Sequence, residues 1–297
     1  MAGQTLSQIR SLLSGAELAP QHRLGQNFLV DLNLMRKVVE AAELSAADTV
    51  LEVGAGTGSL TELLLERDVQ VVAVELDRGL GRILRDRVGR HPRLTLIQAD
   101  ALESKHRVNP LALSLVRERP PRSGGHYKLV ANLPYQIATP LIADMLQVDP
   151  RFERLTCTIQ REVGQRLAAP PGVASYGPAS VTVQTLATVT PHAILPPTAF
   201  WPRPKVQSIL VTIRPRPAKE VDVDDVPGFV AFVQRAFQQR RKMLRRLAFE
   251  LEPTAALQLF GIAGVSADAR PADLSPSAWR SLYRAYCEVA GGRANGL

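Results

Sequence analysis

The stretch Thr49-Val50-Leu51-Glu52-Val53-Gly54-Ala55-Gly56-Thr57-Gly58 decides the fold of this 297-residue chain. Five residues suited to a buried strand are followed by three glycines at alternate positions, and an amphipathic helical pattern begins at Leu60. A strand, a glycine turn and a helix in that order open a βαβ unit. Glycine also lets the backbone turn tightly and approach a ligand closely. We therefore expect a binding site at the end of this strand, the alternative being a glycine turn that binds nothing.

The same alternation of strands and helices continues along the chain. Strands are predicted over residues 49–53, 70–75, 94–98, 127–131 and 155–160, and helices over 60–67, 80–88 and 140–147. Strands that alternate with helices form parallel sheets covered on both faces. Two later β-rich runs, 192–195 and 206–213, are expected to add a hairpin at the sheet edge. The sequence thus predicts an α/β protein with a doubly wound, mostly parallel sheet.

A change in composition predicts a domain boundary near Arg214-Pro215-Arg216-Pro217. Helical patterning alone follows these prolines. We expect one domain over 1–214, whose residues 1–23 form a flexible arm, and a small helical domain over 215–297. Residues 103–126 are rich in Pro, Arg, Ser and Gly, and are expected to be a surface insertion.

Charge and cysteine content narrow the class of protein. The net charge of +8 suggests a polyanionic partner, because Lys and Arg displace condensed counterions from phosphates. Two cysteines are too few for a disulfide scaffold or a zinc site, and Cys157 is expected to be a small core residue. No apolar run approaches the roughly 18 residues that span a bilayer, and the first thirty residues lack a signal-like apolar core. We expect a cytoplasmic protein with no membrane partner and no metal.

Acidic residues at three strand ends favour a nucleoside ligand. A dinucleotide motif would place its third glycine where Ser59 stands, and here Glu52 precedes the first glycine by two residues. This spacing favours S-adenosylmethionine (SAM) over NAD. Glu75 ends the next strand, where an acidic side chain can bind ribose hydroxyls, and Asp100 follows the third, where it can accept from an adenine amino group. The alternative is that these carboxylates are merely solvated.

The tetrapeptide Asn132-Leu133-Pro134-Tyr135 follows the predicted strand 127–131. A side-chain amide can accept from an exocyclic amino group, and an aromatic ring can stack on a base. Asn-x-Pro is also a common turn after a strand, and this second interpretation is open for the motif taken alone. The three preceding strand ends favour a site for a planar amine.

With these motifs the chain resembles the ribosomal RNA adenine N6-dimethyltransferases of the KsgA type, over roughly residues 22–285. It departs from the family pattern at Ala55, where members usually have proline, at Gln136, and in a longer segment between Asp100 and Asn132. The segments that carry the resemblance are Leu24–Leu29, Glu52–Gly58, Asn132–Tyr135, Gln160–Val163, Ser175–Gly177, Pro197–Ser208 and Phe237–Leu244.

The resemblance implies a Rossmann-like class I SAM-dependent methyltransferase fold, with a seven-stranded sheet and a small all-helical C-terminal domain. It implies SAM as the cofactor. Together with the strand-end pattern it assigns cofactor contacts to Asn27, Leu29, Glu52, Gly54, Gly56, Gly58, Glu75, Leu76, Asp100, Ala101 and Asn132.

The implied reaction is dimethylation of N6 on two adjacent adenosines in the 3′-terminal hairpin of small-subunit (16S) rRNA during 30S assembly. We expect the Asn132 side-chain oxygen and the Leu133 carbonyl to accept the two N6 hydrogens. Pro134 would stiffen this turn, and Tyr135 and Phe200 would stack on a flipped base. The protein is expected to act as a monomer. The alternatives are a large-subunit methyltransferase that confers antibiotic resistance, and a docking factor without catalysis in ribosome assembly or transcription.

Residues 235–246 hold six basic residues and no acidic one. A continuous helix running on to Leu247 would place Phe229 and Leu244 on an apolar face and most of these charges opposite. A solvated helix face is the alternative, although mixed signs would then be expected. Arg240 falls on the apolar side and is expected to pair with a carboxylate. The predicted RNA-binding residues are Arg203, Lys205, Arg235, Arg241, Lys242, Arg245 and Arg246.

Overall fold

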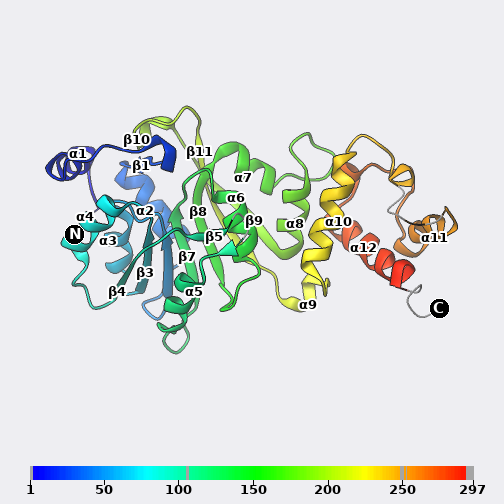
Figure 1. Ribbon diagram of the computed structural model, residues 1–297, viewed down its shortest axis with the longest axis horizontal. Coiled ribbons are helices and arrows are strands. Elements are labelled where there is room, and N and C mark those ends of the chain that lie inside the picture. The colour runs from blue at the N-terminus through cyan, green and yellow to red at the C-terminus, as the bar shows by residue number, and fades with distance from the viewer. Residues whose placement is uncertain (1–2, 105–106, 248–250, 252, 292–297) are drawn as a thin grey trace. The chain divides into compact units, whose positions relative to one another are not determined.

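The computed structural model describes residues 3–104, 107–247, 251 and 253–291 (Figure 1). The chain divides into two compact units. The first unit comprises Met1–Gly164 and Val189–Pro215, and the second comprises Gln165–Thr188 and Arg216–Leu297. The last passage between the units lies one residue from the boundary expected at 214/215. Residues 165–188, which the sequence placed in the first domain, contribute to the second unit.

The first unit is built on a seven-stranded sheet of order β4-β3-β2-β7-β8-β11-β9 (Figure 1). The pairs from β4 to β8 are parallel, and β11 is antiparallel to β8. The prediction of a mostly parallel sheet is therefore confirmed, with β9 and β11 adjacent at one edge. The strands are β2 (Thr49–Val53), β3 (Gln70–Glu75), β4 (Leu94–Gln98), β7 (Tyr127–Asn132), β8 (Arg154–Gln160), β9 (Ala187–Leu195) and β11 (Ser208–Pro215).

The register brings the carboxyl ends of the central strands together. Val53 at the end of β2 is level with Val74 of β3, and Glu75 at the end of β3 is level with Gln98 of β4. All five residues of β2 are buried, as expected of a central strand covered on both faces. The polar groups that follow these strands therefore meet at one edge of the sheet.

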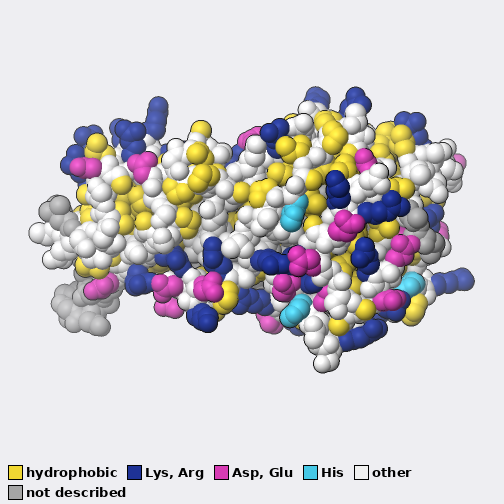
Figure 2. Space-filling view, turned by 180° about the vertical axis from the view of Figure 1, so that it is seen from behind, with side chains coloured by type: hydrophobic (Ala, Val, Ile, Leu, Met, Phe, Trp, Pro, Cys, Tyr) yellow, Lys and Arg dark blue, Asp and Glu magenta, His cyan; other side chains and the backbone are white. Residues whose placement is uncertain are grey.

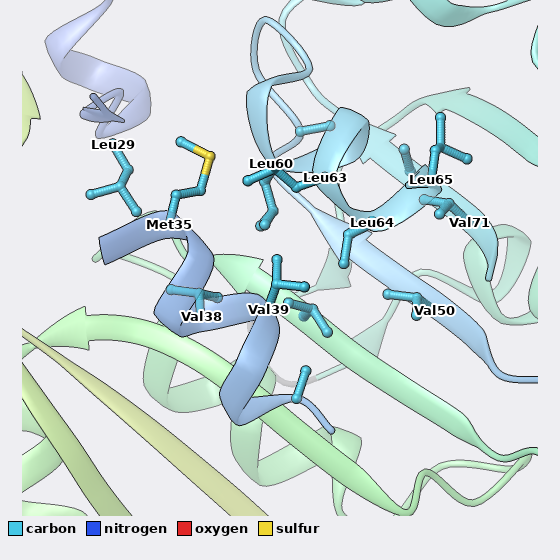
Figure 3. Packing of buried hydrophobic residues seen from close by; sticks show 14 of the residues in the cluster. Leu29, Met35, Val38, Val39, Val50, Leu60, Leu63, Leu64, Leu65 and Val71 are labelled. Atoms are coloured by element: carbon cyan, nitrogen blue, oxygen red, sulfur yellow. The ribbon is translucent and has the colours of Figure 1, made fainter. Parts of the chain in front are cut away.

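Three helices cover one face of this sheet. Met35, Val38 and Val39 recur at the spacing of one helix face and belong to the same buried cluster as Leu60 and Leu64. Figure 3 shows these side chains of the first helix beside those of the second. The helices are α2 (Leu32–Ala41), α3 (Ser59–Leu65) and α4 (Arg78–Val88).

The segment 103–126 is not simply a surface insertion. It contains α5 (Pro110–Arg117), which packs against β2 and β3 and buries Leu113 and Val116. The Asn109 side chain caps this helix by accepting from the Leu111 N–H at 2.9 Å. Composition alone hid the helix because it is short and flanked by Pro and Arg. The neighbouring elements are β5 (Leu102–Ser104), β6 (Arg107–Val108) and α6 (Ala138–Met145).

The expected flexible arm over 1–23 instead contains a packed helix, α1 (Leu6–Gly15). Ile9 and Leu13 are buried against Leu80 and Ile83 of α4. The amphipathic pattern of this helix is weak in the sequence because the segment also contains many small and polar residues. The next elements are the 3-10 turn η1 (His22–Leu24), β1 (Phe28–Leu29), the 3-10 turn η2 (Pro197–Ala199) and β10 (Phe200–Trp201), with β1 and β10 antiparallel.

The second unit is helical and has its own aromatic core. Phe229, Phe232 and Trp279 are buried there, together with Tyr176 from the segment that precedes β9. The Tyr176 hydroxyl donates to the Leu274 carbonyl at 2.7 Å, so this earlier segment is tied into the unit. The remaining elements of the chain are α7 (Arg161–Leu167), α8 (Pro178–Leu186), α9 (Ala218–Val221), α10 (Val226–Gln238), η3 (Leu244–Arg246), α11 (Pro253–Ala263), η4 (Pro271–Asp273) and α12 (Pro276–Gly291).

The prediction of one continuous helix to Leu247 is wrong, because α10 ends at Gln238. The backbone after Gln238 forms hydrogen bonds with another segment of the second unit: the Leu244 N–H donates to the Ala269 carbonyl at 2.8 Å. This pairing buries Leu244 without a helix. Arg240 donates to the Val173 carbonyl at 3.0 Å rather than to a carboxylate. Within the described ranges, no helix combines the length and apolar content needed to cross a bilayer.

Candidate functional site

A cavity of about 310 Å³ lies at the carboxyl ends of β2, β3, β4 and β7. It is lined by thirteen of the predicted site residues, namely Asn27, Leu29, Glu52, Gly54, Gly56, Glu75, Leu76, Asp100, Ala101, Asn132, Leu133, Pro134 and Tyr135. The glycine turn and the tetrapeptide, 78 residues apart between Gly54 and Asn132, thus face one space. Of the predicted cofactor-binding and catalytic residues, Gly58 and Phe200 do not line it.

The glycine turn and the tetrapeptide are in direct contact. Gly54 has φ +73° and Gly56 has φ +60°, a backbone region that side chains disfavour. A Cβ added at Gly54 would lie 3.3 Å from Pro134 Cδ, and one at Gly56 would lie 3.2 Å from Phe28 Cε1. Both glycines are therefore required by close approach as well as by conformation, and the turn forms a cradle next to Pro134.

The third glycine of the turn lies close against a neighbouring helix. Gly58 has φ +89°, and a Cβ there would lie 2.5 Å from Leu84 Cδ1 on α4. Gly58 thus permits α3 to begin close against α4. Gly58 does not line the cavity, and its contact with the cofactor stays a prediction.

Glu75 is held rigidly at the end of β3. Its two carboxylate oxygens accept from the backbone N–H groups of Gly56 at 2.7 Å and Asp77 at 2.8 Å. Burial raises the pKa of Glu75, and these backbone hydrogen bonds oppose that rise. A carboxylate can accept about four hydrogen bonds, so both oxygens keep capacity for the hydroxyls of a ribose.

A polar network on the cavity rim was not predicted from the sequence. Asp77 caps α4 and also accepts from the side-chain amides of Gln21 at 2.6 Å and Gln26 at 3.1 Å. This network ties the segment before β1 to the end of β3. Gln26 belongs to the segment Leu24–Leu29, but Asp77, its partner, is 51 residues away and no local period links the two.

Glu52 is a second buried carboxyl group of the cavity, 1% exposed. The Thr61 hydroxyl donates to it at 2.7 Å. The pKa of Glu52 is raised to about 8, chiefly by burial and also by the charge of Glu75, although the Thr61 hydrogen bond opposes the rise. Two carboxyl groups in one largely apolar cavity favour a cationic ligand, which would offset their mutual repulsion.

Binding of a cationic ligand is expected to release a proton from Glu52. With a pKa of about 8, the group is roughly nine-tenths protonated at pH 7, and a nearby positive charge lowers that pKa. Calorimetry of SAM binding at pH 7, in buffers that differ in ionisation enthalpy, should show release of close to one proton. Glu52→Gln should abolish this release, and the exposed control Glu40→Gln should retain it. Equal release by Glu52→Gln and the wild type would contradict this assignment.

The same shift predicts a stability effect in the free protein. Because the folded-state pKa lies above the ordinary value of 4.5, the folded state holds the extra proton, and the Glu52 contribution to stability falls as pH rises from 4.5 to about 8. The melting temperature of Glu52→Gln relative to the wild type should therefore increase over that range.

The Asn132 amide is fixed at both ends. Its Nδ2 donates to the Asn27 carbonyl at 2.9 Å, and its Oδ1 accepts from the Thr158 hydroxyl at 2.5 Å. The following Leu133 N–H donates to the Thr158 carbonyl at 3.1 Å. Thr158 lies on β8 directly beside the end of β7. No sequence motif indicates this residue, because a threonine in a strand is common.

Of the two aromatic rings predicted to hold a base, one lines the cavity. The Tyr135 hydroxyl shares a 2.7 Å hydrogen bond with Ser208 Oγ, and burial raises the pKa of Tyr135, so its phenol is neutral at physiological pH. Phe200 is only 3% exposed and packs in the same buried cluster as Leu29, its strand partner in the β1–β10 pair. Phe200 thus belongs to a hydrophobic core cluster in this structure, and its stacking on a base stays a prediction.

The predicted RNA-binding residues are divided between the two units. Arg203 and Lys205 are exposed on the first. On the second, Arg241 and Lys242 are exposed, whereas Arg245 pairs with Asp268 at 2.9 Å. The two remaining residues, Arg235 and Arg246, are half-buried and exposed, respectively. The face in Figure 2 has Asp and Glu side chains among its Lys and Arg side chains, so total charge alone does not locate an RNA surface.

The sheet order, the glycine turn after β2 and the carboxylate at the end of β3 define a Rossmann-like class I methyltransferase. The profile of ribosomal RNA adenine dimethylases matches residues 19–287, and the chain belongs to this family. Ribosomal RNA small subunit methyltransferase A of Synechococcus sp. (strain CC9605) is 40% identical over 270 residues, which cover 88% of this chain and 94% of that protein.

Two solved structures share the fold. A dimethyladenosine transferase from Plasmodium falciparum has a TM-score of 0.70 at 20% identity, covering 87% of this chain and 96% of that one. The 23S rRNA methyltransferase ErmE has a TM-score of 0.64 at 24% identity, covering 87% of this chain and 99% of that one. These similarities confirm the predicted fold class.

Proposed function

We propose that this protein transfers methyl groups from SAM to N6 of two adjacent adenosines in the 3′-terminal hairpin of small-subunit (16S) rRNA. One observation carries the proposal: Asn132-Leu133-Pro134-Tyr135 lines the same cavity as the glycine turn and Glu75. A group suited to orient an amino nitrogen is thereby placed beside a cradle suited to a nucleoside. Methyl transfer to an adenine amino group requires that arrangement.

The cavity fits SAM on chemical grounds. Gly54 and Gly56 form a cradle that a Cβ would narrow, and the buried Thr57 hydroxyl has no hydrogen-bond partner among the described residues. Glu75 would hold the ribose, and Glu52 would face the positive charge of the cofactor. Leu76 and Asp100 would border the adenine. When bound, SAM supplies a methyl group that its sulfonium charge has already activated.

Asn132 and Leu133 would orient the attacking nitrogen. The lone pair of adenine N6 is delocalised into the ring, so N6 is a poor nucleophile in its planar form. Acceptance of its two hydrogens by Asn132 Oδ1 and the Leu133 carbonyl would favour a tetrahedral nitrogen with its lone pair exposed. Pro134 fixes the turn that presents this carbonyl, and the ring of Tyr135 would stack on the base, worth about 1–3 kcal/mol.

The choice of substrate is supported by the small-subunit relative at 40% identity. We propose that the first unit carries methyl transfer and the second contacts rRNA within the assembling 30S subunit. The protein would act as a monomer in the cytoplasm. A large-subunit substrate and a docking factor without catalysis are the competing functions.

The test is methyl transfer from labelled SAM to undermethylated small and large ribosomal subunits, with the modified nucleotides mapped. Labelling of two adjacent adenosines in the 3′-terminal hairpin of the small-subunit rRNA is expected. Labelling of the large subunit alone would replace the proposed substrate. Binding without labelling of either subunit would favour the docking factor.

The exposed cations Arg241 and Lys242 are expected to contact phosphates. The logarithm of the affinity falls linearly with the logarithm of the salt concentration, and each phosphate contact that is lost reduces the magnitude of this negative slope by about 0.7–0.9. The double variant Arg241→Gln/Lys242→Gln should therefore bind small-subunit rRNA more weakly, and the magnitude of its salt slope should be smaller by about 1.4–1.8. Filter binding at several salt concentrations measures both quantities. Arg284→Gln, also in the second unit but ion-paired with Asp222, is the control and should leave the slope unchanged.

A further inference from the structure

Thr158 touches the predicted catalytic motif in two independent ways. It is the register partner of Asn132 across the β7–β8 pair and is 1% exposed. Its hydroxyl donates to Asn132 Oδ1 at 2.5 Å, and its backbone carbonyl accepts from the Leu133 N–H at 3.1 Å. A substitution of the side chain would remove the first contact and preserve the second.

The chemistry of the neighbours fixes which way the Asn132 amide points. A backbone carbonyl only accepts, so the Asn27 carbonyl requires the amide nitrogen on its side. The amide oxygen is then directed to Thr158, whose hydroxyl supplies the donor that this oxygen needs. Asn27 and Thr158 together select one of the two possible orientations.

We propose that Thr158 is a positioning residue for methyl transfer, holding Asn132 Oδ1 so that its second lone pair is available to the amino group of the substrate base. An amide oxygen has two lone pairs, and the Thr158 hydroxyl engages one of them. This inference rests on the proposed function, in which Asn132 orients N6. It adds a residue outside every motif by which the family was recognised in the sequence.

The same strand provides a matched control. Thr156 lies two residues before Thr158, so its side chain is on the same face of the sheet. It is fully buried, and within the described part of the chain its hydroxyl has no hydrogen-bond partner. Thr156→Val and Thr158→Val thus make the same chemical change at neighbouring buried positions, and only the second removes a bond to Asn132.

The experiment compares the steady-state methylation of small subunits by the wild type, Thr158→Val, Thr158→Ser and Thr156→Val. Loss of one orienting hydrogen bond is expected to lower kcat of Thr158→Val about 10- to 30-fold, with KM for the RNA and the affinity for SAM within about twofold. Thr158→Ser keeps the hydroxyl and should restore most of the activity, and Thr156→Val should match the wild type. In an Asn132→Ala background, Thr158→Val should cause no additional loss.

A second measurement does not depend on turnover. Proton–nitrogen spectra of protein labelled on asparagine should show a well-ordered Asn132 side-chain amide in the wild type and in Thr156→Val, and exchange broadening of that signal in Thr158→Val. Unchanged kcat and an unchanged Asn132 signal in Thr158→Val would overturn the positioning role. An equal loss of activity from Thr158→Val with and without Asn132 would overturn it as well. A wild type that methylates no rRNA would instead overturn the proposed function, and the amide spectra would then decide the positioning role.

Discussion

Asn132→Ala is expected to lower methyl transfer to small-subunit rRNA by at least about 100-fold, the effect of removing one preorganised group that stabilises a transition state. Asn132 lines the cavity, and its amide is held between Asn27 and Thr158. Leu133 and Pro134 have no polar side-chain atom, and the Tyr135 hydroxyl is already hydrogen-bonded to Ser208 Oγ. The loss should appear in kcat. The affinity for SAM should change much less, since Glu75 and the glycine cradle remain.

Single-turnover methylation with labelled SAM measures the chemical step directly, and titration with SAM tests the cavity. Thr156→Val provides a background in which a buried polar group of the neighbouring strand is lost without contact to Asn132. Near wild-type single-turnover rates in Asn132→Ala would remove the side chain from the proposed mechanism. A variant that no longer binds SAM would show instead that Asn132 mainly maintains the cavity.

Much of the cavity could be predicted because its residues stand where parallel strands end. Glu52, Gly54, Glu75 and Asn132 follow a pattern of strand and turn that the sequence displays locally, and the sheet then gathers them at one edge. The mostly parallel character of the sheet was predicted from the same alternation of strands and helices. Local sequence patterns are sufficient to predict site residues where the topology of the sheet brings those residues together.

The features that the sequence did not indicate have a common physical cause, which is contact between distant parts of the chain. Gly58 belongs to the glycine pattern, yet the side chain of Leu84 determines its role. Phe200 belongs to a family motif, yet its pairing with Leu29 buries it. Thr158 has no motif at all, and only the register of β7 with β8 places it at the site. Such roles depend on tertiary packing and have no local period.

The amino ends of the parallel strands lie opposite the cavity, and for them we predict an effect on stability rather than on catalysis. Lys128, near the amino end of β7, is 5% exposed and lies 2.9 Å from Asp48, which is 1% exposed. Its ammonium group also donates to the Glu43 carbonyl at 2.6 Å. Asp48 accepts from the backbone N–H groups of Ser45 and His126, each at 2.8 Å. These bonds hold the Asp48 carboxylate in place beside Lys128.

Lys128→Met is expected to lower the free energy of unfolding by about 3–5 kcal/mol, because it removes one partner of a buried pair and leaves the Asp48 carboxylate buried without a counter-charge. Urea unfolding followed by circular dichroism measures the loss. The control Arg107→Met breaks an exposed pair with Glu103, whose side chains are 68% and 47% exposed, and should change stability by less than about 1 kcal/mol. Since Lys128 and the cavity lie at opposite ends of the parallel strands, the folded fraction of Lys128→Met should retain the wild-type kcat. Two results would contradict the prediction that Lys128 affects stability and not catalysis. One is a fall in kcat per folded molecule of Lys128→Met, and the other is equal stability of Lys128→Met and Arg107→Met.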